Sequence, residues 1–180
     1  MPKLAIFYGS TTCYTEMVAE KLLALLSADP RFSRFELSQH NIKHTPLTAM
    51  AEFDVLLLGI STWDFGELQE DWEAKWQDIG DVNLDGKVVA IFGLGDQLGY
   101  SDWFVDAVGM LDHAISHNQL QRIGYWSTEG YDFTASKATT DDGQWFVGLA
   151  LDEANQYEQT DQRISDWCDQ IADELSAIGV

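Results

Sequence analysis

The sequence predicts an α/β protein with a doubly wound, parallel sheet. Three observations support this fold class. Short apolar runs alternate with helical patterns along the chain, as in sheets whose strands are joined by helices. The main runs are continuously apolar, which is typical of strands covered on both faces. Unusual loops follow the carboxyl ends of three runs, where ligands bind in such sheets.

The first strand and the first helix are expected on either side of a polar turn. Residues 4–8 form an apolar run that ends at Gly9, and a helical pattern follows until Asp29-Pro30. The apolar positions of this helix are Val18, Leu22, Leu25 and Leu26.

The turn between them is rich in hydroxyl groups. Five of the six residues from Ser10 to Thr15 carry a hydroxyl, and none is lysine or arginine. Free N–H groups and the helix dipole favour an anion at such a turn. The hydroxyls add donors without adding charge. The alternative at this point is an ordinary helix cap by Thr12.

The later elements are assigned in chain order by the same patterns. We expect an edge strand at 34–37, a loop over 40–49, a buried strand at 54–60, a loop over 61–69 and a short helix at 71–77. A buried strand at 88–93 and a loop over 94–101 precede a helix whose stripe is Phe104, Ala107, Val108, Leu111 and Ile115.

The last third of the chain interrupts this alternation. A fifth strand is expected at 122–126, then an aperiodic polar tract at 128–144, then a strand-like run at 145–151. The final helix, 161–178, has one apolar face: Ile164, Trp167, Cys168, Ile171, Leu175 and Ile178. Cys168 is interpreted as a small core residue. No repeat or linker is visible, so residues 1–180 are expected to form a single domain.

Composition limits the partners. The formal net charge is −20, which repels nucleic acid and anionic membranes and favours a partner with a basic face. Acidic surfaces also simply maintain solubility. No apolar run approaches the ~20 residues of a membrane span. The start of the chain leaves no room for a signal peptide, and the two cysteines suit a reducing cytoplasm, so we expect a cytoplasmic protein.

The three loops together indicate a pocket for a planar ring that carries one phosphate. Trp63 follows a buried strand and must lie on the surface or stack on something planar. The loop 93–100 has glycines that allow close approach of the backbone to a ligand, and Tyr100 supplies a second aromatic face.

In these loops the chain resembles the flavodoxins, specifically the long-chain kind. The matching pieces are Ser10-x-Thr12-x-x-Thr15, Thr62-Trp63-Asp64-Phe65-Gly66-Glu67, Gly95-Asp96-Gln97-x-x-Tyr100 and the segment 146–153. The tract 128–144 matches the long-chain insertion in the fifth strand. Flavodoxins are the usual example of a five-stranded parallel sheet of order 2-1-3-4-5 with FMN at the switch point, and that three-layer α/β/α fold is what the resemblance implies.

The resemblance also implies which residues bind non-covalent FMN. The phosphate would be held by Ser10, Thr11, Thr12, Cys13, Tyr14 and Thr15. The ring would lie between Trp63 and Tyr100, with its polar edge at backbone groups of Thr62, Trp63, Asp64, Phe65 and Gly66 and of Leu94, Gly95, Asp96 and Gln97. Two residues depart from the family pattern: Cys13 replaces a common glycine, and Asp64 stands where many relatives have Asn or Gly. We expect the Cys13 thiol to be inert, because nothing basic lies near it in sequence.

The function that the resemblance implies is low-potential, one-electron transfer between semiquinone and hydroquinone states of FMN. The donor would be an NADPH-dependent reductase of the ferredoxin/flavodoxin–NADP reductase kind, and the acceptors would be redox enzymes with basic docking faces. An acidic rim would lower the potential of the anionic, fully reduced flavin; its residues are Asp64, Glu67, Glu70, Asp71, Asp96 and Asp102. We expect a monomer with no nucleic-acid or membrane partner and no enzymatic activity of its own.

Two other classes share this fold. An FMN-dependent NAD(P)H–quinone oxidoreductase needs an open flavin face, which an aromatic sandwich would block. A phospho-accepting receiver needs acids after the first strand and a lysine near the fifth, and both are absent here. A metal at His113 and His117 is not favoured, because two histidines without a third ligand more often mark a solvated face.

Overall fold

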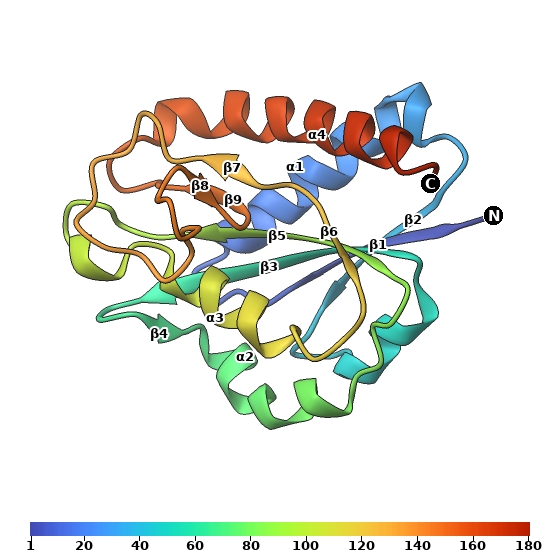
Figure 1. The fold of residues 1–180 in the computed structure, drawn as a ribbon, viewed down its shortest axis with the longest axis horizontal. Coiled ribbons are helices and arrows are strands. Elements are labelled where there is room, and N and C mark those ends of the chain that lie inside the picture. Colours follow the sequence, from blue (N-terminus) through green and yellow to red (C-terminus); the bar gives the residue numbers. More distant parts are fainter.

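A parallel sheet forms the middle layer of the protein, for which a computed structural model describes all 180 residues (Figure 1). The strands lie in the order β2 (Glu36–Asn41), β1 (Lys3–Tyr8), β3 (Val55–Trp63) and β5 (Val88–Leu94), and both β6 (Gln121–Arg122) and β9 (Leu149–Leu151) pair with β5. All of these pairings are parallel. The predicted order 2-1-3-4-5 is confirmed, because β5 is the fourth main strand and β6 and β9 together form the fifth.

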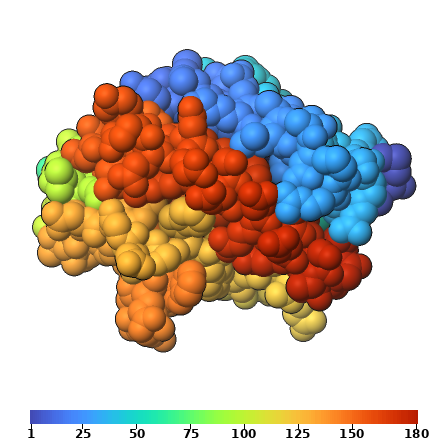
Figure 2. Space-filling view, turned by 90° about the horizontal axis from the view of Figure 1, so that it is seen from above, coloured from blue at the N-terminus to red at the C-terminus, as the bar shows by residue number.

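The fifth strand is split between its two halves. β6 pairs with the start of β5 at Val88 and Val89, whereas β9 pairs with its end from Phe92 to Leu94. The chain leaves the sheet between them and forms an antiparallel pair, β7 (Trp126–Ser127) with β8 (Trp145–Phe146). Part of this excursion is the orange lobe that projects in Figure 2.

Two strand predictions are therefore wrong in detail. The run 122–126 does not continue as one strand, because Gly124 has a φ of 80° and turns the chain out of the sheet. The run 145–151 is divided into β8 and β9 by residues 147–148, which belong to no strand. The expected insertion 128–144 lies inside the excursion.

Two long helices cover one face of the sheet. These are α1 (Tyr14–Ala28) and α4 (Thr160–Ala177), which lie side by side in Figures 1 and 2. Both predicted faces pack into the core, except that Leu25 and Ile178 remain 38% and 40% exposed at their outer edges. Cys168 is a core residue, as predicted, and burial raises the pKa of its thiol to about 12.

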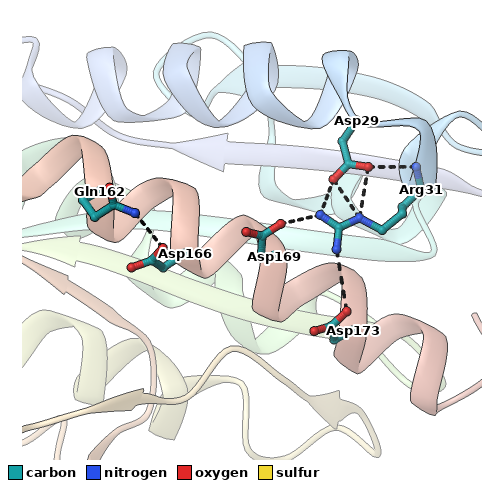
Figure 3. A network of polar contacts seen from close by, with 6 residues as sticks. All are labelled: Asp29, Arg31, Gln162, Asp166, Asp169 and Asp173. Atoms are coloured by element: carbon teal, nitrogen blue, oxygen red, sulfur yellow. Dashed lines mark hydrogen bonds and ion pairs between the residues drawn. The ribbon is translucent and has the colours of Figure 1, made fainter.

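An arginine connects these two helices at the surface. Arg31, just after α1, contacts Asp29, Asp169 and Asp173, and the last two are on α4 (Figure 3). The ion pair to Asp29 is 2.6 Å long and that to Asp173 is 3.6 Å. These groups are partly or largely exposed, so we assign the network an orienting role and little stability.

Short helices and irregular segments cover the other face. α2 (Glu70–Ala74) and α3 (Asp106–Ala114) lie below the sheet in Figure 1, together with 3-10 helices at Leu47–Glu52 and Trp76–Asp81. The helix predicted over 71–77 ends early, at Ala74. Because α3 ends at Ala114, His113 and His117 do not share a helix, and no group of residues has the arrangement of a metal site.

Three further boundaries differ from the predictions. The edge strand begins at Glu36 rather than Arg34 and includes the polar residues up to Asn41, because each pairs with a residue of β1. The loop expected over 40–49 therefore starts later and contains a 3-10 helix. The loop expected over 61–69 contains the end of β3 and a short antiparallel strand, β4 (Glu67–Leu68). No helix combines the length and the apolar character needed to cross a membrane.

Candidate functional site

A cavity of about 390 Å³ lies at the carboxyl ends of β1, β3 and β5. All three unusual loops contribute to it, as the parallel sheet requires. The predicted site residues that line it are Thr11, Thr12, Tyr14, Thr15, Thr62, Trp63, Asp64, Leu94, Gly95, Asp96 and Tyr100. Sequence reasoning missed Ser61, Glu153 and Ala154, which also line it.

The first loop enters α1 through Cys13, whose own side chain does not cap the helix. Cys13 lies in the left-handed region, with a φ of 67°, and Thr12 makes no capping hydrogen bond either. The alternative of a Thr12 cap is therefore wrong. The hydroxyls of Thr12, Tyr14 and Thr15 make no hydrogen bond within the protein, so they are free to donate into the cavity.

The base of this loop is fixed by Glu16. Its backbone N–H donates to Ser10 Oγ over 3.4 Å, and its carboxylate accepts the Tyr8 hydroxyl over 3.0 Å. Burial and the Glu16 carboxylate raise the pKa of Tyr8 to about 12. Ser10 and Cys13, both predicted as phosphate ligands, do not line the cavity; Cys13 is exposed.

The middle of the loop is held by a residue that the sequence analysis did not identify. Gln69 is fully buried, and its Nε2 donates to Thr11 Oγ1 over 3.1 Å and to Asp71 Oδ2 over 2.8 Å. Only the folded structure brings residues 58 positions apart together, so no local pattern marks Gln69 as part of this site.

The second loop brings Trp63 and Asp64 into the lining of the cavity from the end of β3. Pairing of Trp63 with Glu67 fixes the end of β3, and the Trp63 Nε1 donates to Ser61 Oγ over 3.0 Å. Asp64 has a φ of 42° and accepts the Tyr100 hydroxyl over 3.3 Å. The charge on Asp64 raises the pKa of the Tyr100 hydroxyl.

The two residues after Asp64 lie outside the cavity. Phe65 is 65% exposed and makes edge contacts with the rings of Tyr100 and Trp103, at centroid distances of 5.9 and 5.1 Å. Gly66 has a φ of 86°, and an added Cβ would lie 2.9 Å from Asp106 Oδ2. The expected contact of their backbone groups with a ligand stays a prediction.

The third loop is organised by two carboxylates. Asp96 accepts the N–H groups of Leu98 and Gly99 over 3.1 and 2.6 Å and an amide N–H of Asn155 over 2.8 Å. Burial raises the pKa of Asp96, but these three hydrogen bonds outweigh burial and bring the pKa below its usual value.

Gln97 corrects one expectation about this loop. Its backbone N–H, expected to face a ligand, donates instead to buried Asp152 over 3.1 Å, as does its side-chain amide over 2.7 Å. Its Oε1 accepts the Asp132 N–H over 2.6 Å. Gln97 therefore ties the loop to the excursion of the fifth strand and does not line the cavity.

The charged side chains that line the cavity are all acidic. Its lining contains three carboxylates, Asp64, Asp96 and Glu153, and no lysine or arginine. A phosphate can be held here only by N–H and O–H donors, which gather at the Thr11–Thr15 end. The aromatic residues Trp63 and Tyr100 come from the other two loops, after β3 and β5.

Comparisons with known proteins agree with this geometry. The model of the flavodoxin family matches residues 6–167. Flavodoxin 2 of Escherichia coli (strain K12) is 53% identical over 173 residues, covering 96% of both chains. The flavodoxin of Nostoc sp. (strain PCC 7120 / SAG 25.82 / UTEX 2576) is 43% identical over 173 residues, covering 96% of this chain and 97% of its own. The crystal structure of Fusobacterium nucleatum flavodoxin bound to flavin mononucleotide superposes with a TM-score of 0.86 at 28% identity, over 97% of this chain and 99% of that one.

Proposed function

The chain belongs to the flavodoxin family, and from this we propose that it is an electron carrier that binds FMN in the cavity at the ends of β1, β3 and β5. One observation carries the proposal: a single cavity joins an uncharged, hydroxyl-rich loop to two aromatic side chains. This donor set fits a flavin phosphate at one end and a planar ring at the other.

We assign the phosphate to the loop from Ser10 to Thr15. Thr11, Thr12, Tyr14 and Thr15 line the cavity directly. For Ser10 and Cys13, which do not line it, we propose contacts through backbone groups of the loop. Trp63 and Tyr100 are the proposed walls of the ring site, and Thr62 to Gly66 and Leu94 to Asp96 its polar edge. FMN, when bound, supplies the one-electron chemistry, and the protein sets its energetics.

The charges on this chain favour a low reduction potential. Asp64, Asp96 and Glu153 line the cavity, and a flavin that gained negative charge there would be repelled. We propose that the protein operates between the half-reduced and fully reduced states of the flavin. The turn at Asp64 is the proposed element that responds to the half-reduced state, through the Asp64–Phe65 peptide.

The partners are proposed from charge. A net charge of −20 favours redox proteins with basic faces, here an NADPH-dependent reductase as donor and redox enzymes as acceptors. Their association rates should fall steeply as salt is added. We further propose that residues 1–180 act as one cytoplasmic domain and as a monomer.

The test is a stepwise anaerobic reduction of the purified protein, after addition of FMN, followed by visible absorbance. We expect tight FMN binding, and long-wavelength absorbance from half-reduced flavin that rises and then falls. NADPH alone should not reduce the flavin, whereas NADPH with a flavodoxin reductase should. Direct two-electron bleaching by NAD(P)H alone would instead favour the quinone oxidoreductase. A protein that takes up no FMN would contradict the proposal.

A further inference from the structure

We propose that Gln69 is a positioning residue for the flavin phosphate: it holds the Thr11 hydroxyl in the orientation that donates to an anion. The inference rests on the proposed function and adds a residue that does not itself touch the ligand. Gln69 lies at the N-terminus of α2, fully buried, behind the loop that lines the cavity.

The orientation of the Gln69 amide is set by its other two partners. Its Oε1 accepts the backbone N–H of Trp72 over 3.3 Å, and its Nε2 donates to the Asp71 carboxylate over 2.8 Å. A flipped amide would direct an NH₂ group at the Trp72 N–H and an oxygen at a carboxylate. Both contacts would be repulsive, so the flip is disfavoured.

The fixed amide decides what Thr11 can do. Nε2 of Gln69 donates to Thr11 Oγ1 over 3.1 Å, so the hydroxyl oxygen accepts there. A hydroxyl has one hydrogen, which must then point elsewhere. Because Thr11 lines the cavity, that hydrogen is available to a ligand as a donor.

The fold is arranged to let Gln69 reach this position. A Cβ on Gly9 would lie 2.1 Å from Gln69 Oε1, so glycine there leaves the space that the amide occupies. Trp72 secures the segment, since its Nε1 donates to the Gly59 carbonyl over 2.8 Å. The Gly9 N–H donates to the same carbonyl over 3.3 Å.

A fixed donor matters more here than in a cationic site. No lysine or arginine lines the cavity, and three carboxylates do. A hydroxyl that was free to rotate would have to lose that freedom in order to donate to the phosphate. A hydroxyl locked as a donor attracts the phosphate without adding charge.

The test compares FMN with riboflavin, which has the same ring and no phosphate. Gln69→Leu removes the donor, and Gln69→Glu replaces it with an acceptor of the same shape. We expect each to weaken FMN binding about tenfold or more, the size of one hydrogen bond to a charged group, and to leave riboflavin binding within about twofold. Gln170→Leu is the matched control, because Gln170 also donates twice, to the Tyr125 carbonyl and to Glu174, far from the cavity.

A double-mutant cycle with Thr11 isolates the orienting role. Thr11→Val should also weaken FMN selectively, Thr11→Ser should restore it, and adding Gln69→Leu to Thr11→Val should cost little more. Circular dichroism would check folding, and the Thr11 pair keeps the test valid if a Gln69 variant does not fold. Equal losses of FMN and riboflavin, or full additivity in the cycle, would overturn the inference. A wild-type protein that binds neither flavin would instead overturn the proposed function.

Discussion

The two ends of the cavity are built in different ways. The proposed phosphate end, at Thr11–Thr15, is held from behind by half-buried hydrogen bonds, Gln69 to Thr11 and Tyr8 to Glu16. The ring end is held by contacts near the surface, such as that of Tyr100 with Asp64, and by the largely exposed ring of Phe65. The Thr11–Thr15 end is thus held from beneath, whereas the contacts among Tyr100, Asp64 and Phe65 at the proposed ring end face solvent. This suggests that one end determines how tightly the cofactor is held and the other tunes its electronics.

Disturbing the support of the phosphate end should have the largest effect on folding. In Gly9→Ala the added Cβ would lie 2.1 Å from Gln69 Oε1 and 2.9 Å from Trp72. Both neighbours are buried and hydrogen-bonded, so we expect a loss of about 1–3 kcal/mol in the free energy of unfolding. Urea unfolding of the apoprotein measures this.

Gly80→Ala is the control, since nothing lies within 4 Å of its added Cβ. It should change stability by less than about 0.5 kcal/mol. If both substitutions were equally mild, the phosphate end would be less rigid than its hydrogen bonds indicate.

Removing an aromatic wall should affect the ring end alone. We expect Trp63→Ala to weaken FMN and riboflavin alike, by about 1–3 kcal/mol, the usual contribution of one aromatic stacking partner. Fluorescence or calorimetric titration with both flavins measures it. Trp145→Ala, which removes a tryptophan that is 46% exposed and lies on β8, is the matched control and should change neither affinity. A loss confined to FMN would place Trp63 at the wrong end of the site.

The sequence predicted where the two ends of the cavity lie better than it predicted the residues that hold them in place. Apolar runs and the order of three loops located the cavity, because strand ends in a parallel sheet must meet at one edge. The two helices α1 and α4 on one face of the sheet were also predicted closely, since long helices show a clear period of apolar residues. The opposite face was not, because 3-10 segments such as 47–52 have too few residues to show a period.

The contacts that organise the loops could not be predicted in the same way. Gln69 donates a hydrogen bond to Thr11, which is 58 positions away in the sequence, and Gln97 donates one to Asp152, which is 55 positions away. Nothing in the local sequence distinguishes such a glutamine from a solvated one. A resemblance to a family indicates which residues contact a ligand, but not which buried residues hold those in place.

Each end also contains one strained residue, which gives a direct comparison. Cys13 and Asp64 both have positive φ, at 67° and 42°. Asp tolerates this region better than Cys. We therefore expect Cys13→Gly to raise the free energy of unfolding by about 1 kcal/mol and Asp64→Gly by less. Urea unfolding of the two apoproteins would show whether the order is reversed.

The redox consequences of these two variants should also differ. Asp64→Gly removes a carboxylate beside the ring and frees the turn, so we expect more half-reduced flavin during anaerobic titration. Cys13→Gly lies at the phosphate end and should leave that amount unchanged. An equal response from both variants would contradict the division of labour between the two ends.

The smallest expected effect is a pH dependence at the ring end. Asp106 is 1% exposed, lies against Gly66, and accepts the Lys137 N–H over 2.7 Å; burial raises its pKa despite that hydrogen bond. Above the ordinary carboxyl pKa of about 3.9 the folded state therefore holds more protons than the unfolded state. The contribution of this group to stability falls as pH rises through that window. Asp106→Asn keeps an acceptor for Lys137 and cannot ionise, so the stability of this variant relative to wild type should rise from pH 4 upward and then level off.

Tyr8, at the proposed phosphate end, does not interfere with this measurement. Its pKa is raised to about 12, so its contribution to stability falls with rising pH only above about pH 10. A difference between variant and wild type that stayed constant from pH 4 to 7 would show that Asp106 ionises normally, and that the ring end is more open to water than its burial indicates.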